Sequence, residues 1–135
     1  MNKIKKSAVA ALSLVAALAG TVATSGPAAA ASSPVEACGG GSYHVIDSHA
    51  FGSSAITYLL YNGTTNCVVT WKTGARGNTT YVEARLRHSS MYFDVDPGHY
   101  QYYAGPVKVN AGGRCIMWGG GYGDSGWISG WEHCN

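Results

Sequence analysis

The sequence predicts a small all-β domain, an antiparallel β-sandwich or barrel of about seven or eight short strands stapled by two disulfides. Three observations predict it. After residue 35 the chain is rich in Gly, Tyr, Val and Thr and poor in Leu, Glu, Lys and Ala, the strong helix formers. Short stretches of alternating apolar and polar residues are separated by turn residues. An even number of Cys, four, lies in the same part of the chain.

The first 31 residues have the pattern of a secretory signal peptide. Basic residues begin it, an uncharged apolar run covers residues 7–20, and small residues lead to a cleavage position after Ala31. The apolar run is shorter than the roughly 20 residues of a membrane-spanning helix. We therefore expect a cleaved signal over residues 1–31, one secreted, extracellular domain over residues 32–135, and no membrane span.

Removal of this segment changes the charge of the chain. Three of the nine Lys and Arg leave with it, so six basic residues face seven Asp and Glu, which gives a net charge of −1 with neutral His. A basic surface is what nucleic-acid or anionic-membrane binding requires. We therefore expect no nucleic-acid partner.

The strands can be followed in order along the chain. They are expected at residues 43–48, 55–61, 67–72, 81–88, 91–95, 100–103, 107–110 and 114–118, with residues 126–134 pinned by a disulfide. The turn sequence Asn62-Gly63-Thr64-Thr65 makes the second and third of these a hairpin. Asp96-Pro97-Gly98 predicts another turn.

Residues 81–88 show the clearest alternation. Val82, Ala84 and Leu86 point to one face, and the aromatic and charged residues between them point to the other. One buried face and one solvent-exposed face are typical of an antiparallel sheet.

The four Cys are Cys38, Cys67, Cys115 and Cys134. In a small exported domain they predict two disulfides rather than a zinc site, because no two of them form a Cys-x-x-Cys knuckle. Three pairings are open. We favour Cys38–Cys67 and Cys115–Cys134, since pairing of sequence neighbours suits a meander of adjacent strands.

Two local patterns suggest chemistry, and neither is complete. Gly123-Asp124-Ser125-Gly126 resembles the sequence around the nucleophile of chymotrypsin-like proteases, but those enzymes need two barrels and about 104 residues supply one. His44, Asp47 and His49 form a loose acid–imidazole cluster, yet residues 44 and 47 face opposite sides of a strand unless a bulge intervenes. We expect no catalytic residue, no metal site and no cofactor. A small hydrolase acting through Ser125 is the remotest alternative.

The aromatic content is the strongest functional signal. All nine Tyr, four Trp and two Phe lie in residues 32–135, more than a core of this size readily hides. Exposed Tyr and Trp are typical of binding surfaces. The candidate binding residues are Tyr100, Tyr102, Trp127 and Trp131. The alternative is that most Trp belong to the core and the Tyr rings cover strand surfaces.

Four spaced blocks resemble a known family in the same order. They are Tyr58-Leu59-Leu60-Tyr61-Asn62 with Asn66-Cys67-Val68-Val69-Thr70, Tyr102-Tyr103-Ala104-Gly105-Pro106-Val107, Gly113-Arg114-Cys115-Ile116 with Trp118-Gly119-Gly120, and Glu132-His133-Cys134. Together they resemble the spore-associated protein A family of small secreted proteins from sporulating actinobacteria. The likeness extends in pieces from Cys38 to Asn135, and residues 76–96 do not match.

This resemblance implies location more than chemistry. It implies a non-catalytic secreted protein on the spore or cell surface, with a structural or binding role and a partner that is a spore-coat or wall polymer or a protein. The alternative is a secreted inhibitor of an extracellular hydrolase, an amylase or a protease, which would present a rigid loop around Gly119 to Gly126. Amylase inhibitors of the tendamistat type resemble this chain in architecture alone, and their Trp-Arg-Tyr triplet is absent here.

Overall fold

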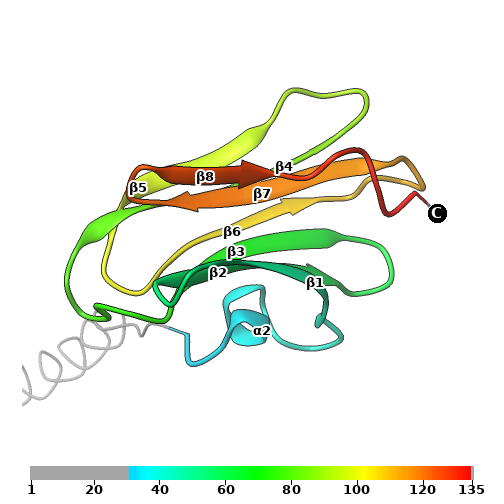
Figure 1. Ribbon diagram of the computed structural model, residues 1–135. Coiled ribbons are helices and arrows are strands. Elements are labelled where there is room, and N and C mark those ends of the chain that lie inside the picture. The colour runs from blue at the N-terminus through cyan, green and yellow to red at the C-terminus, as the bar shows by residue number, and fades with distance from the viewer. Residues whose placement is uncertain (1–30, 135) are drawn as a thin grey trace, which may run out of the picture. The chain divides into compact units, whose positions relative to one another are not determined.

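A computed structural model describes residues 31–134, so the predicted signal peptide, apart from Ala31, lies outside the described residues. These residues form eight strands and one short helix, and the strands lie in two stacked layers (Figure 1). The elements are α2 (Pro34–Ala37), β1 (His44–Phe51), β2 (Ala55–Tyr61), β3 (Asn66–Lys72), β4 (Thr80–His88), β5 (Asp94–Tyr100), β6 (Tyr103–Val109), β7 (Ile116–Tyr122) and β8 (Ser125–Ile128). The predicted all-β class is confirmed, and it takes the form of a sandwich.

Each layer is a four-stranded antiparallel sheet. The strand order is β1-β2-β3-β6 in the first sheet and β5-β4-β7-β8 in the second. The chain crosses between the sheets after β3, after β5 and after β6. As a result β1 and β8, the first and last strands, are edge strands of different sheets.

The predicted hairpin joins β2 and β3, with Tyr61 opposite Asn66. Its turn is held by Asn62, whose side-chain oxygen accepts hydrogen bonds from the main-chain N–H of Thr64 and of Thr65. Gly63 has φ +103°, a conformation that residues with a side chain rarely adopt. The turn residues therefore set this register, as the sequence indicated.

The core fills the space between the two sheets. Its buried residues come from both layers and are Leu59, Val68, Val82, Ala84, Leu86, Ala104, Val107, Val109, Ala111, Ile116 and Trp118. The prediction that Val82, Ala84 and Leu86 of β4 face the core is thus confirmed.

A polar connection crosses this core. The hydroxyls of Thr57 and Thr70 lie 2.7 Å apart, and the Thr70 hydroxyl donates to the main-chain carbonyl of Glu83 in the opposite sheet, also at 2.7 Å. The sheets meet closely here because Gly120 has no side chain, and a Cβ on it would lie 2.2 Å from the Thr70 hydroxyl oxygen.

The outer face of the first sheet is covered by the segment that carries α2. Cys38, Leu60, Cys67 and Val69 are buried there, and the disulfide Cys38–Cys67 fastens the segment to β3. Ser33 caps α2 by accepting from the N–H of Glu36 at 3.1 Å. Within residues 31–134 no helix has the length and apolar character needed to cross a membrane.

The second disulfide joins Cys115 to Cys134 and ties the C-terminal segment to the start of β7. An isolated bridge between Ile116 and Glu132 lies beside it. Both pairs are those favoured from the sequence.

Several expectations about local structure are wrong. Asp96-Pro97-Gly98 is not a turn but part of β5, an edge strand in which Pro is tolerated. The strand expected over residues 100–103 is interrupted, because Tyr100 ends β5, residues 101–102 cross to the other sheet and Tyr103 begins β6. The helix α2 extends past residue 35, where no helix was expected, because Ser33 caps it and Pro34 suits its first turn.

Candidate functional site

The four aromatic residues predicted to bind do not form one surface. Tyr100 is half-buried against the core, and its hydroxyl donates to the carboxylate of Asp96. The other carboxylate oxygen of Asp96 accepts from the N–H of Gly105 at 2.7 Å. The hydrogen bond to Asp96, together with burial, raises the pKa of Tyr100 to about 12. Asp96 therefore links the hydroxyl of Tyr100 to the backbone of β6.

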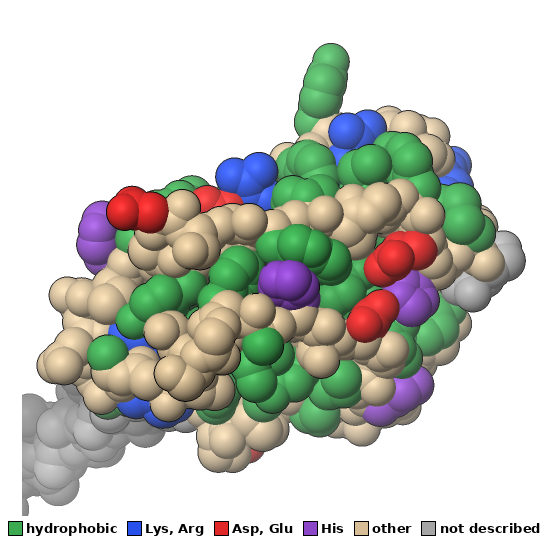
Figure 2. All heavy atoms as spheres, in the orientation of Figure 1, with side chains coloured by type: hydrophobic (Ala, Val, Ile, Leu, Met, Phe, Trp, Pro, Cys, Tyr) green, Lys and Arg blue, Asp and Glu red, His purple; other side chains and the backbone are tan. Residues whose placement is uncertain are grey.

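Trp127 is also half-buried and closes the side of the sandwich where β1 and β8 meet. Its ring stacks on His49 with 4.1 Å between centroids, and it meets the edge of Trp118 at 4.9 Å. On the face seen in Figure 2, hydrophobic side chains run between the two layers with a histidine among them. Trp127 thus seals the core along this side.

Tyr102 is 36% exposed and belongs to an aromatic group on the first sheet. The guanidinium of Arg76 lies 4.7 Å from the ring centroid of Trp71 and 5.1 Å from that of Tyr102. Arg76 also donates to the main-chain carbonyl of Lys72 at 2.6 Å. Arg76 therefore helps to hold the loop after β3.

Trp131 is 44% exposed and lies in a second group, which we call the Arg87 surface. It consists of Arg87, Ser89, Ser90, Met91, Tyr92, Phe93 and Trp131. The guanidinium of Arg87 lies 5.4 Å from the ring centroid of Phe93 and 5.0 Å from that of Trp131. Tyr92 is 92% exposed on the loop between β4 and β5.

The Arg87 surface also contains an open hollow. It has a volume of about 380 Å³ and is lined by Arg87, Ser89, Ser90, Met91 and Tyr92. The Arg87 surface therefore combines aromatic rings, the hydroxyls of Ser89 and Ser90 and the guanidinium of Arg87.

Arg87 differs from Arg76 in its hydrogen bonding, because Arg76 donates to main-chain carbonyls while neither arginine forms an ion pair in residues 31–134. None of the ion pairs within residues 31–134 includes Arg87, and its buried Nε–H has no hydrogen-bond acceptor in that part of the chain. A cation held between two rings without an acid keeps its capacity for an external anion. For this reason the Arg87 surface is the better candidate site.

Sequence reasoning identified Trp131 but missed Arg87 and Tyr92. The alternation in residues 91–95 led to a strand there, whereas β5 begins at Asp94 and residues 89–93 form a loop. The signal that was overlooked is the pair Ser89-Ser90, which is typical of a turn.

The protease-like motif lies at the β7–β8 hairpin. Ser125 lines a pocket of about 300 Å³, and the described residues that line it include no histidine to act as a base. Residues 119–126 form the end of β7, a turn at Gly123 and Asp124 and the start of β8, so the segment expected to be the rigid loop of an inhibitor is a hairpin.

The same pocket holds an ion pair on the outer face of the second sheet. Glu83 is paired with Arg85 and accepts from the hydroxyl of Tyr81 at 2.8 Å. Burial alone would raise the pKa of Glu83, but the hydrogen bonds from Arg85 and Tyr81 and the Arg85 charge leave it lower than usual. The hydrogen bond to Glu83 raises the pKa of Tyr81. Glu83 and Arg85 therefore form a structural ion pair on this face.

A buried lysine closes one end of the sandwich. Lys72 is fully buried and donates to the main-chain carbonyls of Asn78 and Tyr100. Burial, and to a smaller extent the nearby charge of Arg76, lowers its pKa. The donors of Lys72 are used to fasten the loop after β3.

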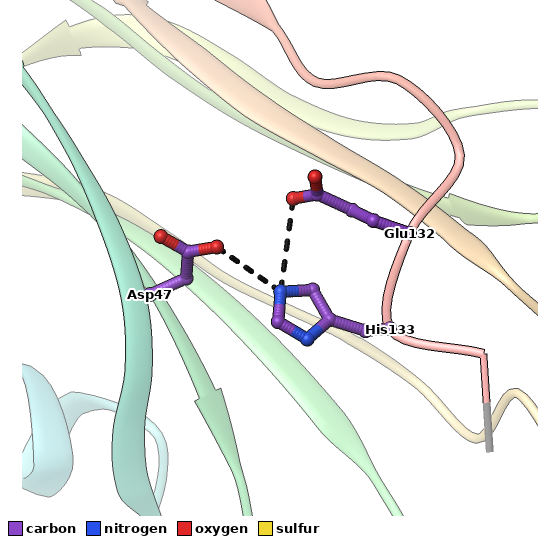
Figure 3. A group of neighbouring side chains, drawn as sticks. All are labelled: Asp47, Glu132 and His133. Carbon is purple, nitrogen blue, oxygen red and sulfur yellow. Dashed lines mark hydrogen bonds and ion pairs between the residues drawn. The ribbon is translucent and has the colours of Figure 1, made fainter.

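Two carboxylates and an imidazole meet beside the C-terminus. Asp47 extends from β1 toward Glu132 and His133 of the C-terminal segment (Figure 3). His133 Nε2 lies 3.1 Å from Asp47 Oδ2 and 3.6 Å from Glu132 Oε1. These three groups could hold a metal ion, although the sequence predicted no metal site.

The cluster expected from the sequence is corrected by this geometry. The bulge that it required does occur, between Val45 and Asp47. However, His44 bonds to the carbonyl of Ser42 and His49 stacks on Trp127, so Asp47 meets a different histidine. No sequence signal connects Asp47 with His133, because 86 residues separate them.

One curated protein is similar to this chain over most of its length. It is named spore-associated protein A, comes from Streptomyces coelicolor, and is 42% identical over 110 residues, which cover 79% of this chain and 68% of that protein. No protein-family model matches the chain. No solved structure matches it either.

Proposed function

Because this chain belongs to the spore-associated protein A family, we propose that it is a non-catalytic secreted protein that attaches to the spore or cell surface through its Arg87 surface. The observation that carries the proposal is the exposure of Tyr92 and Trp131, 92% and 44%. Tyr92 lines the same hollow as Arg87, Trp131 lies against its guanidinium, and Arg87 has no acidic partner in residues 31–134. Large exposed aromatic side chains of this kind mark interaction sites.

The chemistry of the surface indicates its partner. Ring faces pack on sugar rings, the hydroxyls of Ser89 and Ser90 suit hydroxyl groups, and the guanidinium of Arg87 suits an anion. A hydroxyl-rich wall polymer that carries anionic groups combines these features. An open hollow without deep walls accommodates a continuous chain better than a small molecule.

Secretion is part of the proposal. Cleavage after Ala31 would leave the α-amino group of Ser32 at a nitrogen that already lies 2.8 Å from Glu36 Oε1. The new amino terminus would gain a charged partner at the first turn of α2. The expected mature chain begins at Ser32, and mass spectrometry of the exported protein measures this directly.

Fractionation of a sporulating culture tests the location. Antibody detection is expected to find the protein in washed spores and cell walls, and to find less after a wash with high salt. Recovery in the free medium alone would contradict surface attachment. Recovery inside cells with residues 1–31 intact would contradict secretion.

A further inference from the structure

We propose that Asp47, Glu132 and His133 bind a divalent transition-metal ion, with Zn²⁺ as the natural candidate for this donor set. Imidazole nitrogen and carboxylate oxygen together suit Zn²⁺. The three donor atoms lie within 4.8 Å of one another. The proposal concerns β1 and the C-terminal segment, and it does not depend on attachment through the Arg87 surface.

The spacing of the donors fits a tetrahedral ion. Metal–ligand bonds of about 2.0–2.1 Å give ligand-to-ligand separations of about 3.4 Å in a tetrahedron. The two separations from His133 Nε2, 3.1 Å to Asp47 and 3.6 Å to Glu132, bracket that value. The third separation, between the two carboxylate donors, is within 4.8 Å.

The backbone on both sides is fixed so that these side chains converge. Asp47 follows a bulge in β1, a device that redirects a side chain within a strand. His133 has φ +53°, uncommon for a residue with a side chain. The Cys115–Cys134 disulfide and the Ile116–Glu132 bridge hold the C-terminal segment on either side of His133. The donors are therefore positioned before an ion arrives.

Besides its contact with His133, each carboxylate accepts a hydrogen bond that orients it. Asp47 Oδ1 accepts from the N–H of Ser48 at 2.9 Å, which leaves Oδ2 directed at His133. Glu132 Oε1 accepts from the indole N–H of Trp118 at 2.6 Å. Partners of this kind fix ligand orientation in metal sites.

The charge of the cluster favours a dication. In residues 31–134 the ion pairs of Asp47 and Glu132 are with His133 alone. Two adjacent carboxylates repel each other, and a bound cation relieves this repulsion. The side chains are 29–40% exposed, so an ion can enter and keep a water ligand.

Calorimetric titration of the purified secreted protein with Zn²⁺ tests the proposal. One ion per chain is expected, with a rise in melting temperature when Zn²⁺ is added. Asp47→Asn, Glu132→Gln and His133→Gln should each weaken binding by about tenfold or more. His44→Gln is the matched control, an exposed histidine on the same strand outside the cluster, and should bind as the wild type does.

A Co²⁺ spectrum provides a readout that does not depend on variant stability. The wild type is expected to give the intense visible bands of a tetrahedral site, and prior addition of Zn²⁺ should abolish them. The proposal is overturned if the wild type binds no Zn²⁺ at micromolar concentration, or if folded variants bind it as tightly as the wild type. The cluster would then be a structural contact between His133 and the two carboxylates.

Discussion

Arg87 lies over the ring of Trp131, with 5.0 Å between the guanidinium carbon and the ring centroid, although β4 and the C-terminal segment are far apart in sequence. The contact brings the unpaired cation beside the most exposed Trp. It also ties the candidate attachment surface to the C-terminal segment, which the Cys115–Cys134 disulfide holds in place.

Replacement of Arg87 should weaken attachment without unfolding the domain. A hydrogen bond between a guanidinium and an anion of the partner contributes about 1.5–3 kcal/mol, so Arg87→Gln is expected to lower affinity for isolated walls by about ten- to a hundredfold. The remaining binding should depend less on salt concentration, because the charge is gone. Arg76→Gln, which changes the other stacked arginine, serves as the control. Equal losses in the two variants would argue against a specific Arg87 surface.

The Thr70 hydroxyl should contribute measurably to stability because it joins the two sheets. Thr70→Val leaves the Glu83 carbonyl and the Thr57 hydroxyl without this partner, at a cost of about 1–3 kcal/mol in the free energy of unfolding. Thr70→Ser keeps the hydroxyl and should lose less. Urea denaturation measures both variants, and a Val variant as stable as the Ser variant would refute the polar connection.

A methyl group at Gly120 should be poorly tolerated. Its Cβ would lie 2.2 Å from the Thr70 hydroxyl oxygen and 2.5 Å from that of Thr57, so the sheets must separate. Overpacking of this kind costs about 1–3 kcal/mol or more. Gly126→Ala on the neighbouring strand is the control, because its nearest atom would be 3.7 Å away. Thermal melting of the two variants should differ clearly.

Tyr100 should make the domain sensitive to alkali. Its pKa rises from 10.0 to about 12 in the folded state, so the folded protein holds this proton more tightly than the unfolded chain. The unfolding free energy contributed by Tyr100 is therefore complete below pH 10 and is lost as the pH rises toward about 12. Difference titration of tyrosinate absorbance between wild type and Tyr100→Phe checks this. A Tyr100 that ionises with an ordinary pKa would contradict the Asp96 hydrogen bond.

The two disulfides should stabilise the domain in different places. Each closes a loop of moderate length, with sequence separations of 29 and 19, and is expected to contribute about 3 kcal/mol. Paired replacement of Cys115 and Cys134 by Ala should release the C-terminal segment and lower wall binding. Replacement of Cys38 and Cys67 should lower stability alone, provided that the domain remains folded at the assay temperature.

The sequence predicted the elements whose determinants are local. The β2–β3 hairpin follows from Asn62 and Gly63, and the inward side of β4 from the period of Val82, Ala84 and Leu86. The disulfide pairing could be predicted because each bond joins two Cys that follow one another in the sequence and lie in neighbouring segments of the fold. These determinants act over a few residues, so one chain is enough to recognise them.

Features that depend on the packing of distant segments could not be predicted. The turn predicted at Pro97 was wrong because the position of β5 at the sheet edge, which makes Pro acceptable, is a property of the whole sheet. Trp127 was expected on the surface, yet it packs on His49 and Trp118. The meeting of Asp47 with His133 likewise depends on the sandwich bringing β1 beside the C-terminus.

The most direct test of the account is cosedimentation of the purified mature protein with isolated spore and cell walls. The double variant Tyr92→Ala with Trp131→Ala removes both exposed rings of the Arg87 surface. The control Tyr102→Ala removes the exposed ring that lies against Arg76. The account predicts that the double variant loses about tenfold or more in affinity while Tyr102→Ala binds as the wild type does. Undiminished binding by a folded double variant would contradict it.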